Sequence, residues 1–358
     1  MDHLNKRIKN ISQKIWTLVN QIDELKGRWV GGASLNPQVL GRLKKSVLIT
    51  STGASTRIEG AKLSDEDVDK LMRGLSMQKF KDRDKQEVRG YYELLENIFS
   101  AYKKIPFTES SIQHLHKEIL KYVKKDAHHR GDYKKTENQV EMIDETGKSV
   151  AIIFATTPAW LTPKEMHDLM EWVHEAFIKK EIHPLIIITN FIVEFLKTHP
   201  FQDGNGRLSR VLTNLLMLQN GYTYVPYVSH EKLVEDNKTE YYVALRKSQK
   251  TFKTETENIL PWLEFFLNIS LTQAKEAITL LSKENIEKML SPKQLSVWQY
   301  LLTVKEATPG EIAKATDIAR PTVSQALNIL LRLKKVERIG QGRTTRYKKY
   351  NYCKNNVD

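Results

Sequence analysis

Apolar residues recur at helical spacing along most of the chain, and Ser, Asp and Pro stand where the helical segments begin. In "LSDEDVDKLM", Ser64 and Asp67 are spaced to form a capping box at a helix N-terminus. Residues 184–197 predict a buried helix, because apolar side chains lie on nearly every side of it. A second amphipathic helix is expected from Arg210, closed by Gly221. Most of the chain is therefore predicted to be α-helical.

Three stretches add to this helical pattern. Residues 139–154, "QVEMIDETGKSVAIIF", contain two β-prone runs around "DETG" and predict a β-hairpin. Residues 259–290 predict one or two helices, and we place a domain boundary near residues 288–291. After that boundary, the pattern predicts a short helix from Pro309, a second helix opened by Arg320, and two β-prone runs around "GQG".

The composition favours a cytoplasmic protein with no membrane partner. The chain is 40% hydrophobic and 28% charged, and its single cysteine, Cys353, cannot form an internal disulfide. The N-terminus is polar and basic, without the apolar stretch of a secretory signal. The longest apolar run, "PLIIITNFIVEFL", is too short to cross a bilayer.

Positive charge is concentrated in the last fifth of the chain. The whole sequence has a formal net charge of +13, and residues 291–358 hold 13 Lys and Arg against 5 Asp and Glu, a net of +8. A polyanionic partner is therefore plausible for this region.

The stretch "KTHPFQDGNGRLSR" holds the densest chemistry, in the loop between the two predicted helices. The first backbone N–H groups of a helix are unpaired and favour an anion. Gly204 and Gly206 allow a phosphate to approach the backbone, Asn205 offers an amide donor, and Arg207 and Arg210 project from adjacent turns. The loop therefore predicts a polyphosphate site.

Two further side chains extend this prediction to catalysis. Asp203 offers the oxygen ligand that Mg²⁺ prefers beside phosphates, and His199 can take a proton near neutral pH. Two structural alternatives exist: "NG" is commonly a turn, and "DGNG" is a fragment of a calcium loop. No other Asp or Asn falls at the spacing that a calcium loop requires.

The string "HPFQDGNGR" followed by "LSR" resembles the active-site motif of the Fic family, H-P-F-x-[D/E]-G-N-G-R-x-x-R, at every defining position. The segments "IHPLIIITNFIVEFLKT" and "LLMLQNGY" are similar to the helices that flank this motif. Members of the family are mostly adenylyltransferases, which move AMP from ATP to a hydroxyl of a target protein. The resemblance thus implies a transferase that uses ATP and Mg²⁺.

To the mostly α pattern the resemblance adds a Fic-type helical core and a β-hairpin flap. From its own pattern, the C-terminal segment is expected to form a small winged helix-turn-helix domain. The expected divisions are an N-terminal helical region carrying an inhibitory helix, the Fic core, a helical linker and the winged helix domain, at residues 1–105, 106–255, 256–290 and 291–358.

The family's roles carry over to the residues of the motif. His199 would act as general base on a Ser, Thr or Tyr hydroxyl, and Asp203 would hold Mg²⁺ between the α- and β-phosphates. The anion hole and the contacts to the outer phosphates would come from Gly204, Asn205, Gly206, Arg207 and Arg210.

Two further groups are implied around the nucleotide. The hairpin resembles the flap that aligns a target segment by strand pairing, and the residues over the nucleotide would be Ala155, Thr156 and Thr157. The positions that line the adenine pocket in relatives match Tyr241, Tyr242 and Leu245. A pair of aromatic residues at helical spacing can equally belong to the hydrophobic core.

The sequence Ser55-x-x-x-Glu59-Gly60 resembles the family's inhibitory motif, [S/T]-x-x-x-E-[G/N]. A carboxylate paired with Arg210 would remove the partner that the γ-phosphate needs and hold ATP unproductively. The alternative is a solvated glutamate at a helix end. Because some relatives use this glutamate to orient water and remove AMP, the net reaction can run either way.

The basic C-terminal segment has the order of elements of a winged helix-turn-helix. The residues expected to face the major groove are Arg320, Thr322, Ser324 and Gln325. The residues expected to reach phosphates from the wing are Arg338, Arg343 and Arg346. Such domains also serve as protein-binding or dimerisation modules, so that duplex DNA and a protein both remain candidate partners.

Two functions follow from these patterns. The first is an autoinhibited protein adenylyltransferase that modifies a target protein and itself, with an accessory winged helix. The second is a DNA-binding transcriptional regulator whose Fic core senses nucleotide. The intact His199, Asp203 and arginines favour the enzyme, since a sensor needs no general base. A homodimer is left open.

Overall fold

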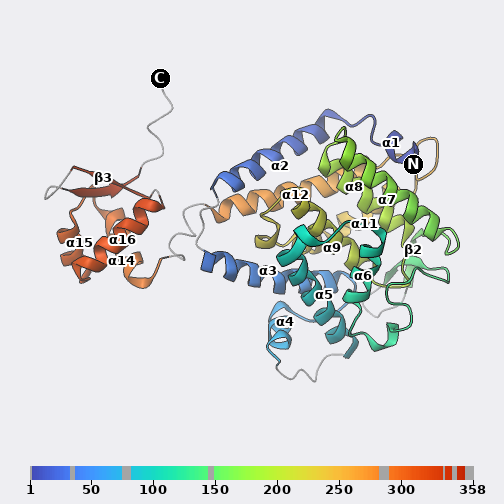
Figure 1. Cartoon of the computed structure of the whole chain (residues 1–358), viewed down its shortest axis with the longest axis horizontal. Helices are drawn as coiled ribbons and strands as arrows, with labels where there is room; N and C mark the ends of the chain where they lie inside the picture. Colours follow the sequence, from blue (N-terminus) through green and yellow to red (C-terminus); the bar gives the residue numbers. More distant parts are fainter. Residues whose placement is uncertain are drawn as a thin grey trace. The chain divides into compact units, whose positions relative to one another are not determined.

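The computed structural model describes residues 2–32, 37–74, 82–143, 149–281, 290–333, 335–340 and 345–350. It divides into two compact units, Met1–Gly31 with Leu40–Thr279, and Gly32–Val39 with Leu280–Asp358 (Figure 1).

The first unit is built from helices and one β-hairpin. Its N-terminal helices are α1 Asp2–Lys6, α2 Gln13–Gly32, α3 Pro37–Ile58, α4 Asp65–Met72, α5 Asp82–Ala101 and α6 Glu109–Ile119, with the short 3-10 helices η1 Tyr102–Lys104 and η2 Lys124–Asp126. The hairpin strands are β1 Gln139–Ile143 and β2 Ser149–Ala155. The later helices are α7 Thr162–Lys179, α8 Pro184–Thr198, α9 Asn205–Gln219, η3 Val225–Tyr227, α10 His230–Asp236, α11 Lys238–Gln249 and α12 Leu260–Leu280.

The helix α8 is the buried centre of this unit, as its apolar pattern predicts. Every residue from Leu185 to Leu196 is buried, and α8 packs against α7 and α9. The capping box predicted at Ser64 and Asp67 is present at the start of α4. In Figure 1, α9 lies among the helices of the unit, and β2 lies near its edge.

The start of α9 differs from the sequence prediction. The helix was expected from Arg210, whereas α9 begins at Asn205. The physical reason is Gly204, whose φ of 79° turns the chain directly into the helix. The Gly-Asn-Gly-Arg segment therefore forms the N-terminal cap and first turn of α9, and Arg210 lies in its second turn.

The hairpin predicted over residues 139–154 is confirmed. The strands β1 and β2 pair antiparallel from Gln139 opposite Ala155 to Ile143 opposite Ser149, with register shifts within β1. The turn around "DETG", residues 144–147, lies outside the described residues.

The predicted linker at residues 256–290 is corrected by the packing of α12. Its residue Trp262 is buried and donates its indole N–H to the Thr189 carbonyl of α8 at 2.9 Å, and its Gln273 amide donates to the Val228 carbonyl at 2.8 Å. These contacts make α12 part of the core of the first unit, which ends at Thr279.

A buried ion network ties the N-terminus to α8. The Arg7 guanidinium donates to the Asn190 amide oxygen and to Glu194 at 2.6 Å each, and to Glu257 at 2.9 Å. Burial raises the pKa of Glu194, but the charge of Arg7 outweighs it, with help from His3, and lowers that pKa to about 2.

The pH dependence of stability should follow from Glu194. Because its folded pKa lies below the ordinary value of 4.5, its contribution is present above pH 4.5 and is lost as the pH falls toward 2. We expect Glu194→Gln to lower the free energy of unfolding by up to about 3 kcal/mol at pH 7 and to flatten its acid limb. Urea unfolding at several pH values measures this. Glu264→Gln, at an exposed pair with Lys14, is the control, and parallel pH curves for Glu194→Gln and wild type would contradict the assignment.

The described residues of the second unit from residue 290 onward form three helices and a two-stranded antiparallel sheet. Its elements are α14 Pro292–Thr303, α15 Pro309–Thr316, α16 Arg320–Arg332, β3 Val336–Ile339 and β4 Arg346–Lys349. Capping boxes at Ser291 and Thr308 open α14 and α15. The helices predicted from Pro309 and Arg320, and the two β-prone runs after them, are thus confirmed.

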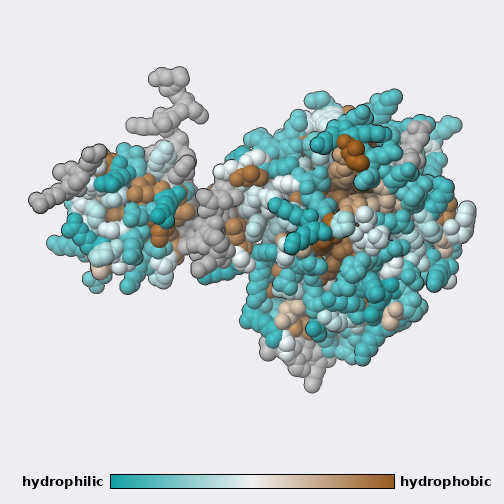
Figure 2. Space-filling model, in the orientation of Figure 1, coloured by the Kyte–Doolittle hydropathy of each residue, from teal (hydrophilic) through white to brown (hydrophobic). Residues whose placement is uncertain are grey.

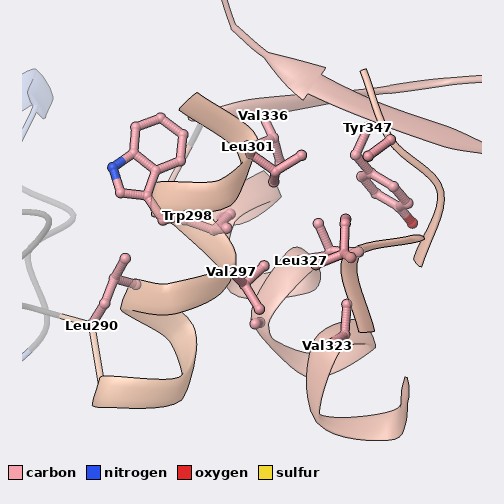
Figure 3. Close-up of a cluster of buried hydrophobic side chains, with 12 residues drawn as sticks. Leu290, Val297, Trp298, Leu301, Val323, Leu327, Val336 and Tyr347 are labelled. Carbon is pink, nitrogen blue, oxygen red and sulfur yellow. The ribbon is translucent and has the colours of Figure 1, made fainter. Parts of the chain in front are cut away.

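The second unit has its own hydrophobic core. Figure 3 shows side chains of α14 and α16 meeting residues of the sheet, and the labelled members are Leu290, Val297, Trp298, Leu301, Val323, Leu327, Val336 and Tyr347. A bridge between Ala307 and Tyr347 joins the segment before α15 to β4.

The surface of the first unit is mostly hydrophilic on the face that Figure 2 shows. Among the described residues, no helix combines the length and apolar character needed to span a membrane.

Candidate functional site

The N-terminus of α9 forms the anion-binding part of the candidate site. Among the described residues, no side chain caps this terminus at Gly204, so its first-turn N–H groups are open to a ligand. A Cβ at Gly206 would meet the carboxylate of Glu59 and come within 3.5 Å of Arg210 Nη1. Gly206 therefore borders the space between Glu59 and Arg210, whereas a Cβ at Gly204 would face His116 and Leu120.

Asn205 has a different role from the one predicted. Its side-chain oxygen accepts the Phe201 N–H at 2.9 Å, and its side-chain amide donates to the Phe201 carbonyl at 2.7 Å. Both ends of the side-chain amide are therefore used to close the loop through Phe201.

The two motif arginines are buried and paired with carboxylates. Arg207 lies 2.9 Å from Glu87 and donates to Asp203 at 3.2 Å. Arg210 donates to Glu59 at 2.8 Å and to the Ser55 hydroxyl at 2.8 Å. Within the described part of the chain, Arg207 Nε and Arg210 Nη1 have no hydrogen-bond acceptor, although both atoms are buried. Unsatisfied guanidinium donors beside a helix N-terminus suit a phosphate ligand.

Glu59 joins two segments that are 151 residues apart in sequence. It follows the last residue of α3, and Gly60 turns the chain away behind it with a φ of 99°. Burial lowers the pKa of Arg210, but Glu59, together with Tyr241 and Tyr91, raises that pKa above its usual value. Ser55, Glu59 and Arg210 thus come together as the sequence predicts.

A second ion pair holds the end of α3 in place. Arg57 donates to both oxygens of Glu235 at 2.6 and 3.1 Å, and it lies 2.9 Å from Asp65. Ser51 donates to the Ser229 hydroxyl at 2.8 Å. Sequence reasoning missed these contacts, because nothing in a single sequence pairs α3 with α10.

His199 ends α8 in the left-handed region, with a φ of 50°. Its Nδ1 lies 3.2 Å from the Leu196 carbonyl. Since a carbonyl can only accept, Nδ1 carries the proton and Nε2 is free to act as a base. Burial lowers the pKa of His199 to about 4, so the imidazole is neutral at pH 7.

Asp203 is held by two arginines at the mouth of the site. Its carboxylate accepts from Arg83 at 2.6 Å, from Arg207 at 3.2 Å and from the Gly204 N–H at 2.5 Å, and 37% of its side chain is exposed. Burial raises the pKa of Asp203, but Arg207, the Gly204 N–H and Arg83 together lower it by more. The net pKa lies below the usual value, so the carboxyl group is ionised.

This environment of Asp203 fits a Mg²⁺ ion that also binds phosphate. No group of three or more metal-ligating side chains occurs in the described residues. Mg²⁺ commonly takes one carboxylate and completes its shell with phosphate oxygens and water. An exposed, ionised Asp203 beside an anion site meets that requirement.

His116 supports the loop from α6 and was missed by the sequence analysis. The Gly131 N–H donates to its Nδ1 at 2.9 Å, so its Nε2 donates to the Asp203 carbonyl at 2.9 Å. Its ring stacks on Phe201 with centroids 3.8 Å apart. The only sequence signal was a histidine on the buried face of a helix, which is common in cores.

The flap threonines turn their hydroxyls into the protein. Thr156 donates to Asn138, and Thr157 donates to Glu165 at 2.6 Å. Their hydroxyls therefore do not face a nucleotide in this structure. Ala155 ends β2, and its side chain is outside the part of the structure that is described.

The predicted adenine-pocket residues divide between core and surface. Tyr241 and Leu245 are buried, and Tyr241 packs edge-on against Trp262 with centroids 5.7 Å apart. The cavity that Tyr241 lines with Arg210 has a volume of about 10 Å³, which holds one water rather than a base. The core interpretation therefore fits Tyr241 and Leu245, and only the half-buried Tyr242 stays available to a nucleotide.

In the second unit, the predicted nucleic-acid contacts lie on α16 and on the sheet. Arg320, Ser324 and Gln325 are exposed and Thr322 is half-buried, whereas the buried side chains of α16 are Val323, Ala326, Leu327 and Leu330. Arg338 is exposed, and Arg346 lies 3.4 Å from Glu306. Arg343 lies outside the described residues.

Comparison with known proteins finds a family match in the central segment of the chain. Residues 106–217 match the model of the Fic/DOC family. The structure is similar to that of a Fic family protein from Desulfovibrio desulfuricans G20, with a TM-score of 0.63 and 24% identity over 95% of this chain and 97% of that chain. It is also similar to a Fic domain containing signalling protein from Bacteroides thetaiotaomicron, with a TM-score of 0.59 and 24% identity over 73% of this chain and 96% of that chain. The fold is therefore a mostly helical Fic fold.

Several sequence relatives are named for an activity, and two of them are described here. A probable protein adenylyltransferase of Aquifex aeolicus is 25% identical over 33% of this chain and 37% of its own length. The protein adenylyltransferase Fic of Drosophila grimshawi is 27% identical over 34% of this chain and 23% of its own length. The similarity thus spans well under half of either relative.

Proposed function

We propose that the first unit is a protein adenylyltransferase, which moves AMP from ATP to a Ser, Thr or Tyr hydroxyl of a target protein and of the chain itself. One observation carries the proposal: a neutral His199, an ionised Asp203 and the unsatisfied donors of buried arginines surround the open N-terminus of α9. The names of the relatives from Aquifex and Drosophila agree with it.

His199 supplies the base for this reaction. Its Nε2 takes the proton of the attacking hydroxyl, whose oxygen bonds to the α-phosphorus while the bond to the pyrophosphate oxygen breaks. Pyrophosphate leaves with the electron pair of that bond. The N–H groups of the first turn of α9, including that of Gly206, stabilise the charge on the phosphate oxygens. Asp203 would hold Mg²⁺, which when bound neutralises part of the charge of the α- and β-phosphates.

Glu59 holds this enzyme in an inhibited state. Its carboxylate pairs with Arg210 and lies against Gly206, where an outer phosphate of ATP would have to bind. A fixed negative charge at this place opposes the γ-phosphate both by repulsion and by occupying the arginine. ATP then binds without its phosphates reaching the productive position.

The same carboxylate can orient a water molecule and remove AMP from a modified protein. The direction of the net reaction is measured by mixing wild-type protein with its own AMP-modified form. The fraction of the protein that carries AMP is followed by mass spectrometry, with and without added ATP. Loss of AMP with wild-type protein, but not with Glu59→Gly protein in its place, supports removal. A stable modification in both samples leaves transfer as the single activity.

Self-modification is the first test of the proposed transfer. Full-length Glu59→Gly protein is incubated with ATP and Mg²⁺, and the intact mass is measured. We expect the mass to rise by one AMP unit per modified hydroxyl. The same protein is also incubated with ATP, Mg²⁺ and a lysate of its source cells. If neither the chain nor any protein of the lysate gains the mass of AMP, the proposal is contradicted.

A second candidate function concerns the second unit, which we propose binds duplex DNA as a winged helix. The residues Arg320, Ser324 and Gln325 of α16 are polar and exposed. The net charge of +8 over residues 291–358 supports a polyanionic partner. The alternatives, a protein partner or a homodimer, are outcomes of the test below.

Binding of DNA should depend on the salt concentration and on the exposed arginine Arg338 of β3. We expect Arg338→Ala to weaken binding of the full chain to any duplex and to reduce the slope of log affinity against log salt by about 0.9, the value for one phosphate contact. Fluorescence anisotropy over a salt series measures both. Lys293→Ala, at an exposed lysine of α14, is the control. Binding that ignores salt, or no binding, would favour a protein partner.

A further inference from the structure

Lys134 is a buried lysine whose ammonium group contacts three separate segments. Only 4% of the residue is exposed. Its Nζ donates to the Asn138 side-chain oxygen at 2.8 Å, to the Thr156 hydroxyl at 3.0 Å and to the Thr198 carbonyl at 3.1 Å. These partners lie before β1, after β2 and at the end of α8, so the three donors of the ammonium are all used.

Two hydrogen bonds of Lys134 enclose His199. The side chain binds the carbonyl of Thr198, and the backbone N–H of Lys134 donates to the Pro200 carbonyl at 2.9 Å. His199 between them has a φ of 50°, which a residue with a side chain adopts only where its surroundings hold it. Lys134 therefore fixes the backbone on both sides of the histidine.

Asn138 extends the same contacts along the motif loop. Its amide donates to the Phe201 carbonyl at 2.9 Å, while its side-chain oxygen accepts from Lys134 and from Thr156 at 2.7 Å. Since Asn138 directly precedes β1 and Thr156 directly follows β2, both ends of the hairpin are attached to the segment that carries His199.

The buried charge of Lys134 argues against a purely structural residue. Among the described residues, no carboxylate forms an ion pair with it. The charged groups that influence it are Glu137, Lys197 and Glu165. Burial lowers its pKa to about 8, so the amine stays mostly charged at pH 7. An apolar side chain would avoid this desolvation cost but could not hold three oxygen acceptors.

We propose that Lys134 is a positioning residue for AMP transfer. Together with Asn138, it fixes the position of His199 relative to the β1–β2 hairpin. The base then stands at a set distance from a target hydroxyl presented along the hairpin. This inference rests on the proposed adenylyltransferase function and names a residue outside the Fic motif. A misplacement of about 1 Å of a reacting group can cost about a hundredfold in rate.

The test uses full-length protein carrying Glu59→Gly, so that transfer is measurable. We expect Lys134→Met in this parent to lower the AMP transfer rate about ten- to a hundredfold, while the affinity for ATP changes less than about twofold. Lys134→Arg should retain most of the rate, because a guanidinium offers donors to the same acceptors. The matched control is Lys135→Met, since the neighbouring Lys135 side chain is exposed and should leave the rate unchanged.

Thermal unfolding of each variant separates misfolding from misplacement. If Lys134→Met does not fold, Asn138→Ala provides the second variant, and it should lower the rate severalfold with ATP affinity retained. Equal rates for Lys134→Met and Lys135→Met in an active parent would overturn the inference, as would equal losses of rate and of ATP affinity. A parent that transfers no AMP at all overturns the proposed function, and this inference with it.

Discussion

Replacing His199 by alanine lowers the rate of AMP transfer by the Glu59→Gly protein about 10² to 10⁴-fold, the usual contribution of a general base. The variant loses the Nε2 that accepts the proton of the attacking hydroxyl. It keeps the N-terminus of α9 and both arginines, so its affinity for ATP should change little. Rates of AMP incorporation and calorimetric titration with ATP measure the two quantities.

His174, an exposed histidine of α7, provides the control for this experiment. His174→Ala should transfer AMP at the parent rate. Undiminished transfer by His199→Ala would remove the assigned role. A parallel loss of ATP affinity would show instead that His199 serves to bind nucleotide.

Replacing Glu59 by glycine should raise the rate of AMP transfer about ten- to a hundredfold above wild type. A charge-assisted hydrogen bond is worth roughly 1.5–3 kcal/mol, and each 1.4 kcal/mol corresponds to tenfold in rate. The gain arises because Arg210 is released and the space against Gly206 is opened to the γ-phosphate. Glu59→Gln, which keeps the length of the side chain and removes its charge, should give an intermediate rate.

The double variant tests whether Glu59 acts through Arg210. Arg210→Ala alone should lower the rate, and adding Glu59→Gly should recover little, since the arginine that it releases is absent. This non-additivity is expected of residues in direct contact. If the two substitutions act independently, or if Glu59→Gly transfers AMP at the wild-type rate, inhibition through this pair is wrong.

Much of the fold could be predicted because hydrophobic spacing reports local structure. The buried helix α8 and the hairpin lie within a residue or two of their predicted limits. The start of α9 was placed five residues late, since a glycine cap at Gly204 leaves no polar side chain to mark it. The packing of α12 into the core was also missed. A sequence with apolar residues at helical spacing predicts a helix, but it does not say whether that helix forms a linker or packs into the preceding domain.

The candidate site shows a similar division. The proximity of Glu59 to Arg210 was expected from resemblance to a family motif, which no local pattern could supply across 151 residues. The side chain of Asn205 was assigned to the anion, but a sequence does not say which way an amide points. His116 and Lys134 were not found, because each is a single polar residue whose role depends on contacts with the distant motif loop.

The measurement that tests the central claim most directly is transfer of label from two forms of ATP. Glu59→Gly protein is incubated with Mg²⁺ and ATP labelled either at the α- or at the γ-phosphate, and the protein is separated and counted, with His199→Ala in the same background as the blank. We predict that label from the α-phosphate becomes covalently attached to protein, that label from the γ-phosphate leaves as pyrophosphate, and that the His199→Ala sample stays near background. Attachment of the γ-label, or attachment of neither label to the chain or to any protein of its source cells, would contradict adenylyl transfer.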